Sequence, residues 1–89
     1  MTHALKCWPE YFALLEIGDK LFELRKDDRP FNNGDDVLLQ EFEPALAAYT
    51  GKEVKLSIAF ILRNLPKSFG LKPGFCILGL KPKNKDYYI

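Results

Sequence analysis

The sequence has few of the residues from which metal centres and disulfide scaffolds are built. It contains two cysteines, Cys7 and Cys76, outside any CxxC pattern, and a single histidine, His3. These are too few ligands for a zinc site, so we expect no metal and no cofactor. Both cysteines have apolar or aromatic neighbours, and we expect them to be buried and reduced.

The sequence also lacks an excess of charge of either sign. Thirteen basic and twelve acidic side chains leave a net charge of +1. A general electrostatic affinity for nucleic acid needs a broad basic surface, which this balance excludes. Any binding of a polyanion must therefore come from a local cluster of cations and involve a small footprint.

Long apolar runs are missing as well. The first residues have no basic start and no following apolar stretch, so we expect no signal peptide, no membrane association and a cytoplasmic protein. At 89 residues the chain fits one domain, spanning 1–89, and residues 81–89 are a candidate for a flexible tail. The oligomeric state stays open, and so does the docking of Tyr87, Tyr88 and Ile89.

Apolar periodicity predicts a mainly β fold with one or two short helices. Strands are expected at 3–7, 21–26, 37–43, 53–63 and 75–80. Short strands separated by turn residues, including a turn at 49–52, are typical of a small antiparallel barrel of five to six strands. In the segment 53–63, alternation predicts that Phe60 and Leu62 share the apolar face of Ile58.

A short helix is predicted over residues 9–17. Pro9 suits the first position of a helix, and Gly18 suits the position just after its end. The apolar face of this helix is predicted from the spacing of four side chains: Tyr11, Phe12, Leu14 and Leu15.

Three charged residues follow Gly18 and form the strongest functional signal. Glu23 and Arg25 lie two residues apart on a predicted strand, so they share one face, opposite Phe22. Lys20 has the other parity and joins them only if the turn after Gly18 redirects it. Lysine and arginine donate to phosphates and carbonyls, and a glutamate accepts from amino groups. The other interpretation is a solvated polar face with a weak ion pair.

The spacing G-x-K-x-x-E-x-R at residues 18–25 resembles the signature of the ASCH domain family, which has the PUA-like fold. Three flanking segments strengthen the resemblance: Leu5-Lys6-Cys7-Trp8-Pro9, Asn33-Gly34-Asp35 and Gly70-Leu71-Lys72-Pro73-Gly74. Together they look like a compact bacterial or phage branch of that family and cover roughly residues 2–80. The resemblance implies a small β-barrel whose helix lies beside a cleft.

The same resemblance implies a binding site for single-stranded RNA or a nucleotide-like ligand. Carried over to this chain, the signature places Lys20, Glu23 and Arg25 in the cleft, with Gly18 as the backbone turn. Lys6 and Trp8 precede the helix, and Trp8 is a candidate for stacking on a base. Lys72 and, more weakly, Arg63 are further candidates, whereas Tyr49 is interpreted as a loop anchor and not as a stacking platform.

Two other functions stay open. Some ASCH relatives hydrolyse acylated cytidines, and others are reported to cleave RNA. If this chain is an enzyme, Lys20 and Glu23 are the catalytic candidates. However, Glu23 stands where that hydrolase subgroup has a threonine, and residues 64–73 lack its acidic residue. We therefore lean toward a binding module; a structural or protein-interaction domain is the third possibility.

Overall fold

The computed structural model describes residues 1–83, which form one curled sheet and one α-helix. The elements are β1 (Thr2–Cys7), α1 (Pro9–Glu16), β2 (Phe22–Lys26), β3 (Asp36–Glu43), β4 (Ala48–Leu62), a 3-10 turn (Lys67–Phe69) and β5 (Phe75–Pro82). The prediction of a mainly β domain with a short helix is confirmed. No helix within the described residues has the length and apolar character needed to cross a bilayer.

Strand β5 extends into the segment 81–89, which was expected to be a flexible tail. Strand β5 continues to Pro82, two residues past its expected end, and Lys83 forms an ion pair with Asp36 at 2.7 Å. The expected tail therefore begins later than residue 81. Residues 84–89, which include Tyr87, Tyr88 and Ile89, lie outside the described part of the chain.

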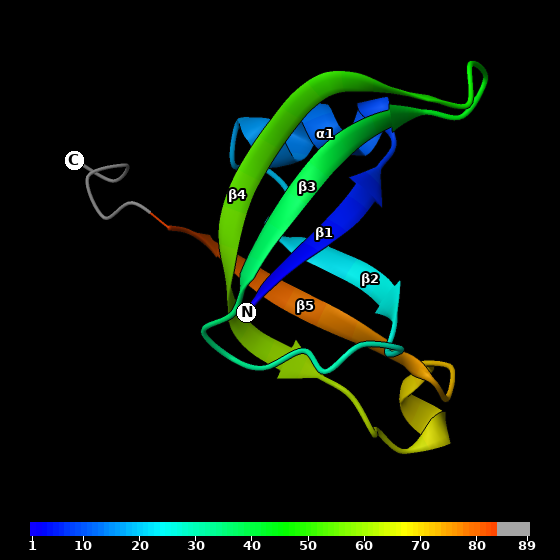
Figure 1. Ribbon diagram of the computed structural model, residues 1–89. Helices are drawn as coiled ribbons and strands as arrows, with labels where there is room; N and C mark the ends of the chain where they lie inside the picture. The colour runs from blue at the N-terminus through cyan, green and yellow to red at the C-terminus, as the bar shows by residue number, and fades with distance from the viewer. Residues whose placement is uncertain (84–89) are drawn as a thin grey trace.

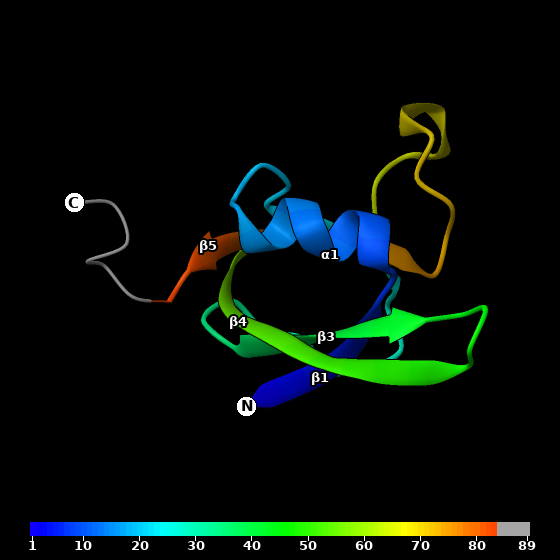
Figure 2. The same cartoon turned by 90° about the horizontal axis from the view of Figure 1, so that it is seen from above.

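The five strands form a half-barrel in the order β1-β3-β4-β5-β2. Figures 1 and 2 show the sheet curling around α1, which lies across its concave side. The pairs β3–β4, β4–β5 and β5–β2 are antiparallel, whereas β1 pairs with β3 in parallel. The expectation of an all-antiparallel barrel is wrong at this pair, because α1 and β2 lie between β1 and β3 and supply a crossover long enough for parallel pairing.

Strands β1 and β2 are the two edges of the sheet, and arginine side chains span the seam between them. Arg25 Nη1 donates to the carbonyl oxygen of Lys6 at 3.0 Å, and Arg29 Nη1 donates to that of Ala4 at 2.8 Å. An edge strand exposes backbone groups that need partners. The two guanidinium groups supply those partners to alternate carbonyls of β1 and fix the distance between the edges.

Helix α1 packs on the sheet through a narrow face. Its buried side chains are Phe12 and Leu15, whereas Tyr11 and Leu14 are exposed. The four-residue apolar face predicted for this helix is therefore wrong for two of its members, because one short helix on a concave sheet buries only its innermost stripe. Gly18 follows the helix with a φ of 83°, the left-handed conformation expected just after a helix end.

The core fills the space between α1 and the concave side of the sheet. Its fully buried members include Leu5, Val37, Leu39, Cys76 and Leu78. Cys7 is also buried, and neither cysteine forms a disulfide, which confirms the prediction of two buried thiols.

Strand β4 is longer than expected and changes face along its length. It starts at Ala48, so residues 49–52, for which a turn is predicted, belong to the strand. The chain reverses between Glu43 and Ala48 instead. A register shift opposite β5 falls between Ile58 and Phe60. Such a bulge reverses the parity of all later residues. Ile61 therefore points to the core, and the prediction that Phe60 and Leu62 do so is wrong.

Asp35 anchors the first residues of the chain to the loop before β3. Its Oδ2 lies 2.9 Å from Nε2 of the buried His3 and accepts from the backbone N–H of Asn32 at 3.0 Å, while Oδ1 lies 3.3 Å from the N-terminal amine. These hydrogen bonds, with that from His3 foremost, lower the pKa of Asp35 below its ordinary 3.8.

This lowered pKa predicts an acid-sensitive stability. A carboxylate with a lowered pKa in the folded state stabilises the fold above its ordinary pKa, and that contribution is lost as the pH falls below about 3.8. We expect the melting temperature of Asp35→Asn to fall less than that of the wild type between pH 5 and pH 3. Asp28→Asn, at an exposed aspartate, is the matched control and should follow the wild type. Equal slopes for wild type and Asp35→Asn would refute this role.

Candidate functional site

The polar and apolar sides of β2 are reversed relative to an ordinary surface strand. Glu23 pairs with Leu78 of β5, which in turn pairs with Ile61 of β4, so the glutamate extends a row of core positions. Its side chain points inward and the residue is only 7% exposed, whereas Phe22 and Leu24 are 49% and 58% exposed. The interpretation of Glu23 as part of a solvated face is therefore wrong. A buried charge costs free energy, and such a feature is commonly retained for function.

Two cations hold the Glu23 carboxylate. Lys20 Nζ lies 2.6 Å from Oε1, and Arg25 Nη1 lies 3.8 Å from Oε2. Lys20 precedes the regular part of β2 and also donates to the carbonyl oxygen of Phe22 at 2.7 Å. The turn after Gly18 thus redirects Lys20 toward the other two residues, as the motif required. The result is a carboxylate between two cations on the inner side of an edge strand, with a hydrogen bond from Lys20 and an ion pair with Arg25.

These residues line a groove between α1 and β2. It consists of two adjoining pockets of about 250 and 260 Å³, which share Tyr11 and Glu23. We call it the α1–β2 groove, and its full lining is Lys6, Cys7, Trp8, Tyr11, Lys20, Phe22, Glu23, Leu24 and Arg25. The structure therefore brings together five of the seven residues expected in the cleft.

Aromatic rings form the wall of the groove on the helix side. The rings of Trp8 and Tyr11 stack with centroids 6.5 Å apart and an angle of 21° between their planes. Trp8 is 51% exposed at the start of α1, so it is not a core residue. The sequence analysis missed Tyr11 because it placed this residue on the buried face. Its spacing of three residues from Trp8 on a helix was the available signal.

Lys6 lies at the end of the groove nearest the β3–β4 hairpin. Its Nζ is 4.3 Å from the ring centroid of Phe42 and 5.8 Å from that of Tyr49, and its carbonyl oxygen accepts from Arg25. Tyr49 also packs edge-on against Phe42 at 5.2 Å. Tyr49 thus anchors the hairpin and holds the Lys6 ammonium beside the groove without lining it.

Gly18, Lys72 and Arg63 lie outside the groove. Lys72 lines a separate pocket of about 270 Å³ with Leu24 on the outer side of β2. Arg63 pairs with Asp27, with Nε 2.8 Å from Oδ2 and Nη2 3.1 Å from Oδ1, and so fastens the loop after β2 to the end of β4. Gly18 acts through the backbone turn alone.

Cys7 lines the groove as a protonated thiol. Burial, followed by the negative charge of Glu23, raises its pKa from 9.0 to about 11. The thiolate is the nucleophilic form of cysteine. At neutral pH Cys7 therefore contributes an apolar surface to the groove and no reactive group.

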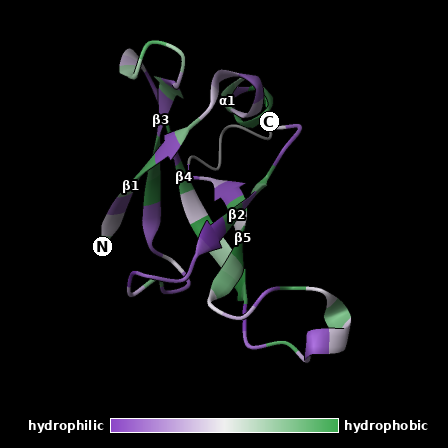
Figure 3. Cartoon of the chain, turned by 90° about the vertical axis from the view of Figure 1, so that its right-hand side faces the viewer, coloured by the Kyte–Doolittle hydropathy of each residue, from purple (hydrophilic) through white to green (hydrophobic). Residues whose placement is uncertain are grey.

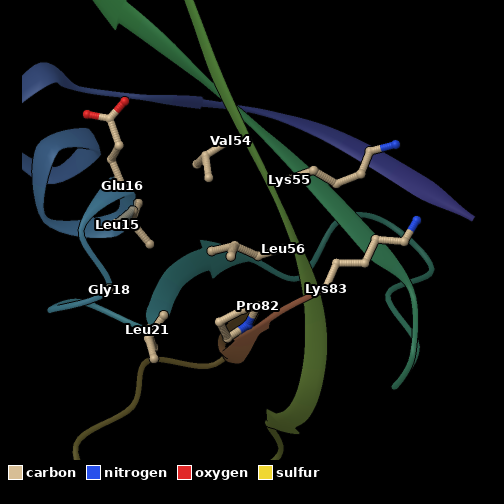
Figure 4. A pocket seen from close by; sticks show the side chains of 9 residues that line it. All are labelled: Leu15, Glu16, Gly18, Leu21, Val54, Lys55, Leu56, Pro82 and Lys83. Atoms are coloured by element: carbon tan, nitrogen blue, oxygen red, sulfur yellow. The ribbon is translucent and has the colours of Figure 1, made fainter. Parts of the chain in front are cut away.

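Another pocket, at the other end of α1, has a different character. Figure 4 shows Leu15, Leu21 and Leu56 bordering a cavity of about 160 Å³, while the ends of Lys55 and Lys83 point away from it. The charged residues that line it, Glu16, Lys55 and Lys83, are all exposed, and Lys83 pairs with Asp36. The chemistry of the described chain is therefore concentrated in the α1–β2 groove.

The fold and the groove define the class of protein: a small single-domain β half-barrel with a charged, aromatic-walled groove beside its helix. The model of one family, a domain of unknown function named DUF3850, matches residues 2–80. The chain belongs to the DUF3850 family. A comparison with curated proteins finds no match.

Proposed function

We propose that this protein is a binding module for a nucleotide or for single-stranded RNA, and that the α1–β2 groove receives one base. The observation that carries the proposal is the buried Glu23, held between Lys20 and Arg25 on a strand whose apolar side chains face outward. A structural role would place the apolar side chains inward and the glutamate in water.

The groove offers each kind of contact that a nucleotide needs. Glu23 accepts hydrogen bonds, so it suits an exocyclic amino group such as that of cytosine or adenine. Lys20 and Arg25 donate to a base carbonyl or a phosphate. Trp8 and Tyr11 present ring surfaces on which a base can stack. Because the net charge is only +1, we expect a site for one or a few nucleotides.

The resemblance of residues 18–25 to the ASCH signature supports the same proposal, since RNA binding is the usual suggestion for that family. The small hydrolase is the weaker candidate. Cys7 is protonated at neutral pH, and the carboxylate of Glu23 is already engaged by Lys20 at 2.6 Å.

Amide NMR titrations with cytidine monophosphate and uridine monophosphate test this proposal. We expect cytidine monophosphate to shift the amides of Trp8, Tyr11 and residues 20–25. Uridine monophosphate should bind several-fold more weakly, because it presents a carbonyl to Glu23 where cytosine presents an amino group. An absence of shifts with both nucleotides, or shifts confined to other surfaces, would contradict the proposal.

A further inference from the structure

The outer side of β2, β5 and β4 carries an apolar surface that none of the described residues, 1–83, covers. Phe22 of β2 pairs with Gly79 of β5, which pairs with Phe60 of β4, and these three residues form one row across the strands. The next row contains Leu24, Ile77 and Leu62. We call these two rows the outer face. Figure 3 shows β5 in mostly hydrophobic shades along this section.

Two phenylalanine rings dominate the outer face. Phe60 is 58% exposed, and Phe22 is about half exposed. No side chain stands between them, because Gly79 occupies the middle of the row. Since neighbouring strands lie about 4.8 Å apart, the backbones of Phe22 and Phe60 are roughly 10 Å apart. Two exposed rings across a glycine on a sheet form a platform on which flat groups can stack.

Two lysines lie at outward positions beside these two rows. Lys26 follows Leu24 on β2, and Lys81 follows Gly79 on β5, each two residues farther along the same side. Lys20 reaches the same edge, with its Nζ 4.8 Å from the centroid of the Phe22 ring. The outer face therefore combines aromatic rings with positive charge, which is the combination that binds single-stranded nucleic acids.

Lys20 also joins the outer face to the α1–β2 groove. Its Nζ contacts Glu23 on the inner side of β2 and lies over Phe22 on the outer side. Phe22 and Leu24 border the groove as well as the outer face, so the two surfaces meet along the edge of β2. A phosphate bound at Lys20 would thus lie between a base in the groove and a base on Phe22. A second copy of the chain fits less well, because a two-fold interface would bring the lysines of one copy toward those of the other.

We propose that the outer face is a stacking surface for a single-stranded nucleic acid, which passes over the β2 edge at Lys20 and crosses Phe22 and Phe60. The inference takes from the proposed function only the class of ligand. It adds a second surface, with bases stacked on the two rings and phosphates near Lys26 and Lys81.

Fluorescence anisotropy with a labelled eight-nucleotide oligocytidylate tests the surface in the full chain. Phe60→Ala should weaken binding roughly ten-fold, because one stacked base is lost. Phe60→Tyr keeps the ring and should retain wild-type affinity. Phe69→Ala is the matched control, since Phe69 is an exposed phenylalanine in the 3-10 turn outside both rows. Lys81→Gln should reduce the slope of log affinity against log salt by about 0.7.

The outcomes separate this inference from the proposed function. Cytidine monophosphate binds only the groove, so Phe60→Ala should leave its affinity unchanged. If that nucleotide binds and Phe60→Ala binds the oligonucleotide as tightly as wild type, the outer face is not a nucleic-acid surface. The inference also fails if sedimentation shows a wild-type dimer that Phe60→Ala dissociates, because the face is then a protein interface. If cytidine monophosphate does not bind at all, the proposed function of the groove fails.

Discussion

We expect Glu23→Gln to bind cytidine monophosphate at least ten-fold more weakly than the wild-type protein. Glutamine keeps the shape of glutamate but loses its charge, and its amide nitrogen can present donors where the ligand's amino group also donates. A hydrogen bond to a charged group contributes about 1.5–3 kcal/mol, which corresponds to roughly a 10- to 150-fold change in affinity. Isothermal titration calorimetry at constant salt measures this change.

Glu53→Gln is the matched control for this substitution. Glu53 lies on β4, and its Oε2 accepts from Gln40 at 2.9 Å on an exposed part of the hairpin, outside the groove. This variant should bind the nucleotide as the wild type does. Equal affinities for Glu23→Gln and the wild type would show that the buried carboxylate does not contact the ligand, and the structural interpretation of the cluster would then be favoured.

We expect Phe12→Ala to have the largest effect on stability of any substitution in α1. Phe12 is 1% exposed and fixes the helix to the concave side of the sheet. Removing a buried phenylalanine costs about 3–5 kcal/mol, a large part of the roughly 5–15 kcal/mol that holds a domain of this size together. The melting temperature should fall by roughly 15–30 °C. Thermal and urea unfolding, followed by circular dichroism, measure the loss.

Leu14→Ala is the control for the helix. Leu14 lies two residues after Phe12 on α1 and is 40% exposed, so its truncation should lower the melting temperature by a few degrees at most. Because Trp8 and Tyr11 belong to the helix end that Phe12 anchors, we also expect Phe12→Ala to weaken nucleotide binding. A Phe12→Ala protein with wild-type stability would mean that α1 does not depend on this contact.

The side chains of β2 are arranged in a way that does not favour stability. Glu23 occupies a core row beside Leu78, while Phe22 and Leu24 face outward. An edge strand selected for stability alone would have the opposite pattern. The same reversal creates both the charged groove on the inner side and the apolar outer face, so one short strand accounts for both proposed surfaces.

Local sequence signals predicted several features correctly. Pro9 and Gly18 mark the start and the end of α1, because their backbone preferences act within a few residues. The alternation along residues 22–25 placed Glu23 and Arg25 on one face for the same reason. The G-x-K-x-x-E-x-R spacing identified where to look, and the turn after Gly18 brings Lys20 to Glu23 at 2.6 Å.

Features that depend on contacts between distant segments could not be read in this way. The bulge in β4 reverses the side on which Phe60 lies, and it is defined only by the register with β5. Tyr11 was expected in the core but lies in the groove, because one short helix on a curled sheet buries only its innermost side chains. Lys72 was expected in the cleft, but the path of the chain places it on the outer side of β2. Pairing register and sheet curvature are properties of the assembled strands.

By itself, the sequence determined a small, mainly β domain with a short helix from Pro9, two unlinked cysteines and a Lys20–Glu23–Arg25 cluster, because composition, turn residues and side-chain parity act locally. Only the tertiary structure decided that the cluster faces inward. Alternation shows which side chains share a face of β2, but pairing with β5 and the position of α1 decide which face is covered. Because the covered face is the one that carries the three charged residues, they line a groove beside α1.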